Sequence, residues 1–147
     1  MKPVSKKNYH HYATCGLDSV YLVNGFEHHE TGYGHGVSVH DLDGLHRAIG
    51  LHVVNLKRGL TGKEFRFLRV ELDRSQKSLG DLLKKTDQAV AIWEKRNKVP
   101  REVDIILRNL YMESIGKNPC INDFDRTVQE DEEICFREYK NGWKKAA

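Results

Sequence analysis

Apolar residues recur at helical spacing between residues 60 and 115 and predict four helices in close order there. The first spans about 62–72, the second begins at Gln76, the third begins near Asp87, and the fourth runs from Pro100 to about Ile115. We expect their buried faces to consist of Phe65, Leu68 and Leu72, then Leu79, Leu82 and Leu83, then Val90 and Trp93, and lastly Val103, Ile106, Leu107, Leu110 and Tyr111.

Capping residues stand at the predicted helix starts. Thr61 and Glu64 have the spacing of a capping box, in which each side chain bonds the other residue's backbone amide. Ser75 is suited to cap the second helix, and either Thr86 or Asp87 the third. Caps and apolar spacing therefore agree on where these helices begin.

The first 57 residues predict a small, loop-rich sheet followed by one helix. Short β-like runs lie at 9–12, 20–23 and 36–40, and Gly and Asn between them favour tight turns. Asp41 is placed to cap a helix over about 42–57. The apolar face of that helix would consist of Leu42, Leu45, Ile49, Leu51, Val53 and Leu56.

The end of the chain predicts a helix over about 121–133 and a strand over 134–139. Asn141-Gly142 follows that strand and is a strong hairpin signal. The resulting C-terminal β element is a candidate addition to the N-terminal sheet.

The second and third central helices have the features of a helix-turn-helix. Two short helices joined by a tight turn cross closely only where the residue at the crossing is small, and Gly80 meets that demand. With Val90 and Trp93 turned inward, the third helix would present an outer face to the major groove. That face consists of Thr86, Asp87, Gln88, Ala91, Ile92 and Lys95.

We therefore expect a mainly α fold in three parts. Residues 1–57 form a small α+β segment, residues 58–116 form the helix-turn-helix bundle, and residues 117–147 form a helix plus a short β element. The two outer parts together would make one small α+β module.

Charge is concentrated in the middle of the chain. Although the 147 residues carry a net charge of only +3, residues 57–101 hold thirteen Lys and Arg against six Asp and Glu. A basic block of this kind is usually a solvated face, and binding of an anionic partner such as nucleic acid is the alternative. The three cysteines form no Cys-x-x-Cys pair, and no long apolar run predicts a membrane span or a signal peptide, so we expect a cytoplasmic protein with free thiols.

The motif Ser75-Gln76-x-x-Leu79-Gly80, followed by Val90-x-x-Trp93-Glu94-Lys95 and Pro100, resembles the helix-turn-helix domain of the XRE family. That family includes the lambdoid phage repressors, and the match covers about a third of the chain. The resemblance implies a transcriptional regulator that binds double-stranded DNA at an inverted-repeat operator as a homodimer.

Base contacts and phosphate contacts follow from the resemblance together with the basic residues around the helix. The base-reading residues would be Asp87, Gln88, Ala91, Ile92 and Lys95, although a capping role is an equal alternative for Asp87. The phosphate contacts would be Gln76, Lys77, Lys63, Arg66, Lys85, Arg96, Lys98 and Thr86.

The resemblance also implies an internal ion pair between Arg69 and Glu94, which would hold the recognition helix in register. Three positions depart from the family pattern, because Asp73, Lys84 and Arg96 stand where glycines are usual. A left-handed backbone at Lys84 or Arg96 would cost roughly 1 kcal/mol.

The flanking sequence, including Tyr9-His10-His11-Tyr12 and Cys15-Gly16-Leu17-Asp18, is similar to regulators grouped with the MqsA-like antitoxins. This similarity implies a toxin protein as a further partner. The chain lacks the paired cysteines of their zinc ribbon. Six histidines cluster in the first 40 residues, but their spacing enforces no convergence, so we expect no metal site and no cofactor.

No catalytic motif is present, since the chain has no Gly-x-Ser-x-Gly and no phosphate-binding Gly-x-x-x-x-Gly-Lys. We therefore expect a non-enzyme, a repressor or antitoxin that controls its own operon. The alternatives are a metal- or ligand-responsive DNA-binding sensor that uses the His-rich N-terminal segment, and a helical scaffold for protein interactions.

Overall fold

A computed structural model of the chain describes residues 8–118 and 133–146. Its helices are α1 (Leu42–Val54), α2 (Gly62–Glu71), α3 (Gln76–Leu83), α4 (Asp87–Glu94) and α5 (Arg101–Ser114). Its strands are β1 (His10–His11), β2 (Val20–Leu22), β3 (Phe26–Thr31), β4 (Gly34–Val39), β5 (Ile134–Tyr139) and β6 (Gly142–Lys145). The predicted helix over 121–133 lies almost wholly outside these residues. Within the described ranges, every helix is too short or too polar to cross a membrane.

The mainly α fold class is wrong, because the described chain has an α+β fold. Helices contain 42% and strands 22% of the described residues, and the strands form two sheets. The main unpredicted element is β3, whereas its partner β4 overlaps the predicted run at 36–40. Five of the six residues of β3 are polar, so no apolar alternation marks this exposed strand.

The four-stranded sheet joins the two ends of the chain. Its strand order is β1-β2-β5-β6, in which β5 runs parallel to β2 and antiparallel to β6. Val20 is opposite Ile134 and Leu22 is opposite Phe136. The hairpin of β5 and β6 confirms the Asn141-Gly142 signal, and its pairing with β2 adds it to the N-terminal sheet.

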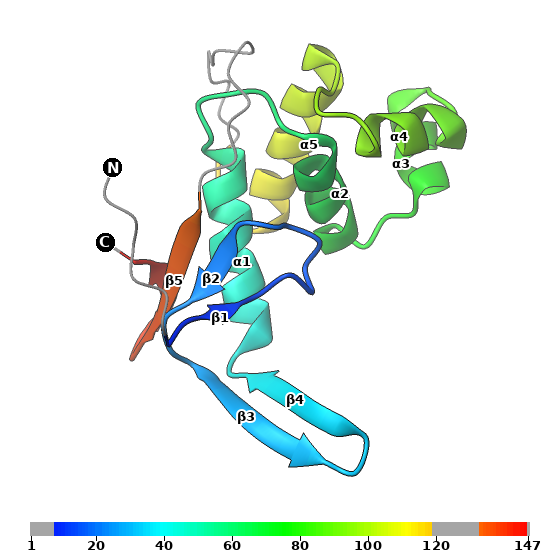
Figure 1. Cartoon of the computed structure of the whole chain (residues 1–147). Helices are drawn as coiled ribbons and strands as arrows, with labels where there is room; N and C mark the ends of the chain where they lie inside the picture. The colour runs from blue at the N-terminus through cyan, green and yellow to red at the C-terminus, as the bar shows by residue number, and fades with distance from the viewer. Residues whose placement is uncertain (1–7, 119–132, 147) are drawn as a thin grey trace.

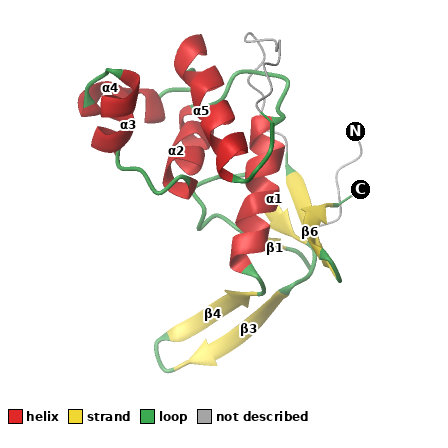
Figure 2. Ribbon diagram, turned by 180° about the vertical axis from the view of Figure 1, so that it is seen from behind, coloured by secondary structure: helices red, strands yellow, loops and turns green. Residues whose placement is uncertain are grey.

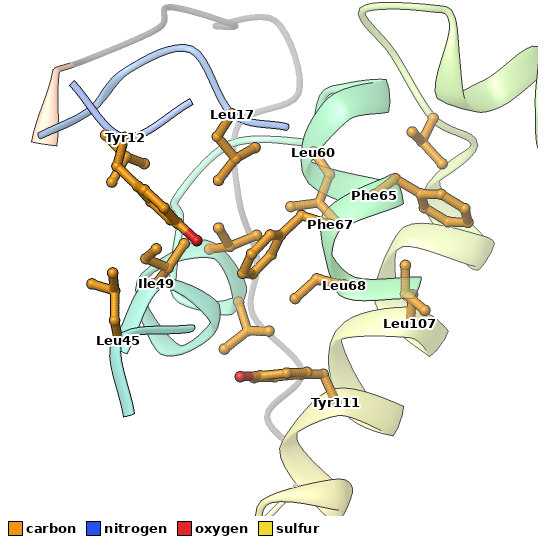
Figure 3. Packing of buried hydrophobic residues seen from close by; sticks show 14 of the residues in the cluster. Tyr12, Leu17, Leu45, Ile49, Leu60, Phe65, Phe67, Leu68, Leu107 and Tyr111 are labelled. Atoms are coloured by element: carbon orange, nitrogen blue, oxygen red, sulfur yellow. The ribbon is translucent and has the colours of Figure 1, made fainter. Parts of the chain in front are cut away.

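One hydrophobic core contains side chains from all three predicted parts of the chain. Leu45 and Ile49 of α1 pack with Leu68 of α2, Leu107 of α5 and Phe136 of β5. Figure 3 shows side chains from α1, α2, α5 and the segment around Tyr12 directed into one cluster. In contrast to its predicted burial, Leu82 of α3 is 46% exposed, because the short helix packs mainly through Leu79 and Gly80.

A buried ion pair fastens α5 to the loop that follows α1. Arg108 Nε is 2.6 Å from Asp104 Oδ1, and both side chains are almost fully buried. Arg108 also donates to the backbone oxygens of Leu56 and Arg58, while Asp104 Oδ2 accepts from the backbone N–H of Leu60. The pair thus satisfies the backbone of an irregular loop that would otherwise leave polar groups unpaired.

A second polar chain joins the N-terminal segment to α2. The Tyr12 hydroxyl is 2.7 Å from His46 Nε2, and His46 Nδ1 is 2.6 Å from Glu71 Oε1. Because Tyr12 follows β1, His46 is in α1 and Glu71 ends α2, these contacts fix three elements relative to one another. These two hydrogen bonds therefore link α1 and α2 to the segment that follows β1 of the sheet.

Two buried tyrosines predict a loss of stability in strong base. Burial raises the pKa of Tyr12 and of Tyr111 from 10.0 to about 12. The unfolded chain loses these phenolic protons first, so the stabilisation is complete below pH 10 and is lost as the pH rises from 10 toward 12. Urea unfolding across this range measures the decline, which Tyr12→Phe and Tyr111→Phe should each reduce. A double variant that declines as steeply as the unchanged protein would contradict this assignment.

Candidate nucleic-acid interface

The two short helices α3 and α4 begin at side-chain caps. The Ser75 hydroxyl accepts the backbone N–H of Ser78, and the Thr86 hydroxyl accepts that of Ala89. Thr86 rather than Asp87 is therefore the N-cap of α4. Asp87 Oδ1 instead accepts the N–H of Gln88, which places its negative charge at the positive end of the helix.

The turn between α3 and α4 depends on Gly80 and on a left-handed residue. A Cβ added to Gly80 would lie 2.8 Å from the backbone oxygen of Lys85, so only glycine permits this approach. Lys84 ends α3 with φ of 57° and ψ of 42°, and Asp73 has φ of 56°, whereas Arg96 does not have a positive φ. Two of the three departures from the family's glycine pattern therefore adopt left-handed geometry.

Glu94, the last residue of α4, is held by side chains from two other helices. Arg69 Nε lies 2.5 Å from Glu94 Oε2, and Arg69 Nη2 and Gln76 Nε2 each lie 3.1 Å from Glu94 Oε1. The Glu94 side chain is only 4% exposed. Arg69 and Glu94 thus form an ion pair that joins α2 to α4, while Gln76 joins α3 to the same carboxylate.

Gly62 makes a structural contact that no motif in the sequence predicts. A Cβ at this position would lie 2.5 Å from the backbone oxygens of Trp93, Glu94 and Arg96, and the Gly62 N–H donates to Arg96 at 2.8 Å. The first turn of α2 therefore abuts the last turn of α4, with opposite ends of the two helix dipoles in contact. The only signal in the sequence is a glycine at the first position of a capped helix.

The outer face of α4 is accessible at the end of the molecule farthest from the four-stranded sheet (Figures 1 and 2). Asp87, Gln88 and Lys95 are exposed and Ala91 is half-buried. Ile92 is 46% exposed, whereas Val90 on the inner face is fully buried. Trp93 also turns inward, with its ring edge-on to Phe65 at a centroid distance of 6.1 Å.

The residues predicted to contact phosphate differ in their exposure and in the contacts that they already make within the protein. Those that are exposed are Lys63, Arg66, Lys77, Lys85, Thr86, Arg96 and Lys98. However, Lys63 contacts the carboxylate of Asp18, and Arg66 Nε lies 4.0 Å from Glu94 Oε1. Gln76 is half-buried and uses one of its two amide hydrogens on Glu94.

The histidines lie mainly on the hairpin of β3 and β4 and near β1, away from α3 and α4 (Figure 1). In the part of the chain that the structure describes, no group of three or more His, Cys, Asp and Glu could hold a metal ion. The outer face of α4 contains cationic, amide and apolar groups and the carboxylate of Asp87, and no metal-ligand cluster is found on it among the described residues.

A short capped helix with an exposed outer face and cations beside it has the size and charge to enter a major groove. No protein-family model, curated protein or solved structure matches this chain. The support for contact between α4 and nucleic acid is thus the geometry and charge of this structure.

The two arginines near Glu94 provide a matched pair of substitutions. Arg69→Met removes the buried partner of a buried carboxylate and should lower the free energy of unfolding by about 3–5 kcal/mol. Arg66→Met removes a 59% exposed side chain beside the same carboxylate and should cost less than about 1 kcal/mol. Urea unfolding measures both values, and equal losses would show that the Arg69 pair does not hold the helices together.

Lys84→Gly should raise the free energy of unfolding by about 1 kcal/mol, because glycine adopts left-handed backbone without strain. Arg96→Gly is the control, because the backbone at Arg96 is not left-handed and glycine relieves no strain there. The added backbone entropy of the unfolded chain should lower the free energy of unfolding by about 0.5–1 kcal/mol. Thermal unfolding at a fixed pH compares the two variants. The assignment fails if Lys84→Gly is the less stable of the pair.

Proposed function

We propose that this protein is a sequence-specific, double-stranded DNA-binding transcriptional regulator that inserts α4 into the major groove. It would act as a repressor or antitoxin on its own operon. The observation that carries the proposal is the accessibility of Gln88 and Ile92, which lie about one turn apart on the exposed face of α4. Their accessibility meets the first requirement for reading base edges.

The exposed face of α4 has suitable chemistry for direct readout. The Gln88 amide can pair with N6 and N7 of adenine, and the apolar side chain of Ile92 can contact a thymine methyl group. Lys95 can donate to guanine, Asp87 can accept from the cytosine amino group, and Ala91 leaves room for a base to approach. Contact with a thymine methyl group would also explain why Ile92 is partly exposed among polar residues, because that contact would remove its apolar surface from water.

The surrounding cations support an attraction to phosphate. Lys77 in α3, Lys85 in the turn, and Arg96 and Lys98 after α4 are exposed on the elements next to the outer face. The free amide hydrogen of Gln76 and the Thr86 hydroxyl can donate further contacts at the two helix starts. Phosphate contacts of this kind make affinity fall steeply with salt.

We further propose that the protein binds as a homodimer to an inverted repeat. One recognition helix reads only about four to six base pairs, so useful specificity needs a second copy with half-sites one helical turn apart or a multiple of it. A DNA target would require the protein to act in the cytoplasm, at the nucleoid. A toxin protein would be a second partner if the antitoxin role applies.

The second candidate function is a metal-responsive DNA-binding sensor. The observation that favours it is a pair of imidazoles on the hairpin of β3 and β4, where His28 Nδ1 lies 2.8 Å from His35 Nε2. In that case α4 would bind DNA in the same way, and an ion on the hairpin would alter the affinity.

Two substitutions separate base reading from phosphate attraction. Gln88→Ala should weaken binding to the DNA upstream of the protein's own gene by roughly 1–3 kcal/mol and leave binding to random DNA unchanged. Lys85→Ala should weaken binding to both and reduce the salt slope by about one. Lys140→Ala, in the turn between β5 and β6, is the control and should change neither.

Fluorescence anisotropy at several salt concentrations measures these affinities. If Gln88→Ala affects both kinds of DNA equally, α4 does not read bases. If the unchanged protein shows no salt-sensitive binding to either DNA, the DNA-binding proposal is overturned, which is the outcome that the scaffold alternative predicts.

A further inference from the structure

The hairpin of β3 and β4 projects from the body of the molecule, away from α3 and α4 (Figures 1 and 2). In its antiparallel register Glu30 is opposite His35 and His28 is opposite Val37. Side chains alternate between the two faces of a strand, so His28, Glu30 and His35 share one face. His29 and Ser38 lie on the other face, where His29 Nε2 is 2.8 Å from Ser38 Oγ.

The two imidazoles on the shared face point ring nitrogens at one another. His28 Nδ1 is 2.8 Å from His35 Nε2, and the ring centroids are 5.0 Å apart. On the far side of the second ring, His35 Nδ1 is 2.8 Å from Glu30 Oε1. A carboxylate accepts a hydrogen bond, so the neutral His35 carries its proton on Nδ1 and its lone pair on Nε2.

This arrangement is close to that of two imidazoles bound to one metal ion. With bonds of 2.0–2.1 Å to a tetrahedral ion, two nitrogen ligands lie roughly 3.3 Å apart, only about half an ångström more than here. Both side chains are exposed, with the His28 ring edge-on to Phe26 at a centroid distance of 5.5 Å, so opening the pair by this amount requires only small side-chain rotations. A carboxylate that holds the second nitrogen of a histidine is also the usual outer partner of a metal-bound imidazole.

We propose that His28 and His35 form a two-ligand site for a divalent transition metal ion that prefers imidazole, such as Zn²⁺, Ni²⁺ or Cu²⁺. His28 Nδ1 and His35 Nε2 bind the ion, Glu30 orients His35, and water completes the coordination. Binding moves the His28 proton from Nδ1 to Nε2 through solvent, so both ligands remain neutral and no net proton is released. The register of the hairpin thus brings together two histidines whose proximity the sequence did not predict.

The metal site can be tested apart from DNA binding, because its residues lie on an element that contains none of the predicted DNA contacts. The sensor alternative rests on this site, whereas the repressor proposal does not. Calorimetric titration of the untagged full chain with Zn²⁺, and then with Ni²⁺, tests it. We expect about one ion per chain. The affinity for the ion should be at least tenfold lower in His28→Ala and in His35→Ala, and about tenfold lower in Glu30→Gln. His29→Ala, on the opposite face, should bind as the unchanged protein does.

Imidazole NMR spectra of the unchanged protein provide a measurement that needs no variant. Zn²⁺ should shift the ring signals of His28 and His35 together and move the His28 proton to Nε2. The proposal is overturned if neither ring signal shifts at millimolar Zn²⁺. It is equally overturned if His29→Ala abolishes binding while His28→Ala does not.

Discussion

The buried carboxylate of Glu94 is the contact on which the arrangement of the helical end depends. Glu94 ends α4, where the helix dipole is negative, so a buried carboxylate is unfavourable there without a cation. Arg69 supplies the charge with two hydrogen bonds and Gln76 supplies a third. Since Arg69 is in α2 and Gln76 is in α3, this one carboxylate joins all three helices.

The orientation of the outer face of α4 follows from that contact and from two glycines. Gly80 lets the turn approach α3, and Gly62 lets α2 approach the last carbonyls of α4. With its start capped by Thr86 and its end held at Glu94, the helix has little freedom to roll. The accessibility of Gln88 and Ile92 is thus a consequence of contacts that Arg69, Glu94, Gly62 and Gly80 make inside the protein, together with the Thr86 cap.

Sequence patterns predicted much of this helical region because helix starts are local. The Thr61 and Glu64 capping box, the Ser75 cap and the crossing at Gly80 are all present in the structure. The patterns failed where the determining contact is distant or absent. The strand at Phe26–Thr31 faces water and has no apolar alternation, and the fit of Gly62 under α4 depends on a residue more than 30 positions away. The pairing of His28 with His35 likewise depends on a strand register that composition does not encode.

Site-specific photo-crosslinking tests the central claim, that α4 is the surface that meets DNA, most directly. A photoreactive amino acid is placed at Ile92, which is 46% exposed on α4, and in a second protein at Ile106, which is 42% exposed on α5. Irradiation with the DNA upstream of the protein's own gene should give a covalent adduct from position 92 and none from position 106. Adducts from position 106 alone, or equal adducts from both, would contradict the account.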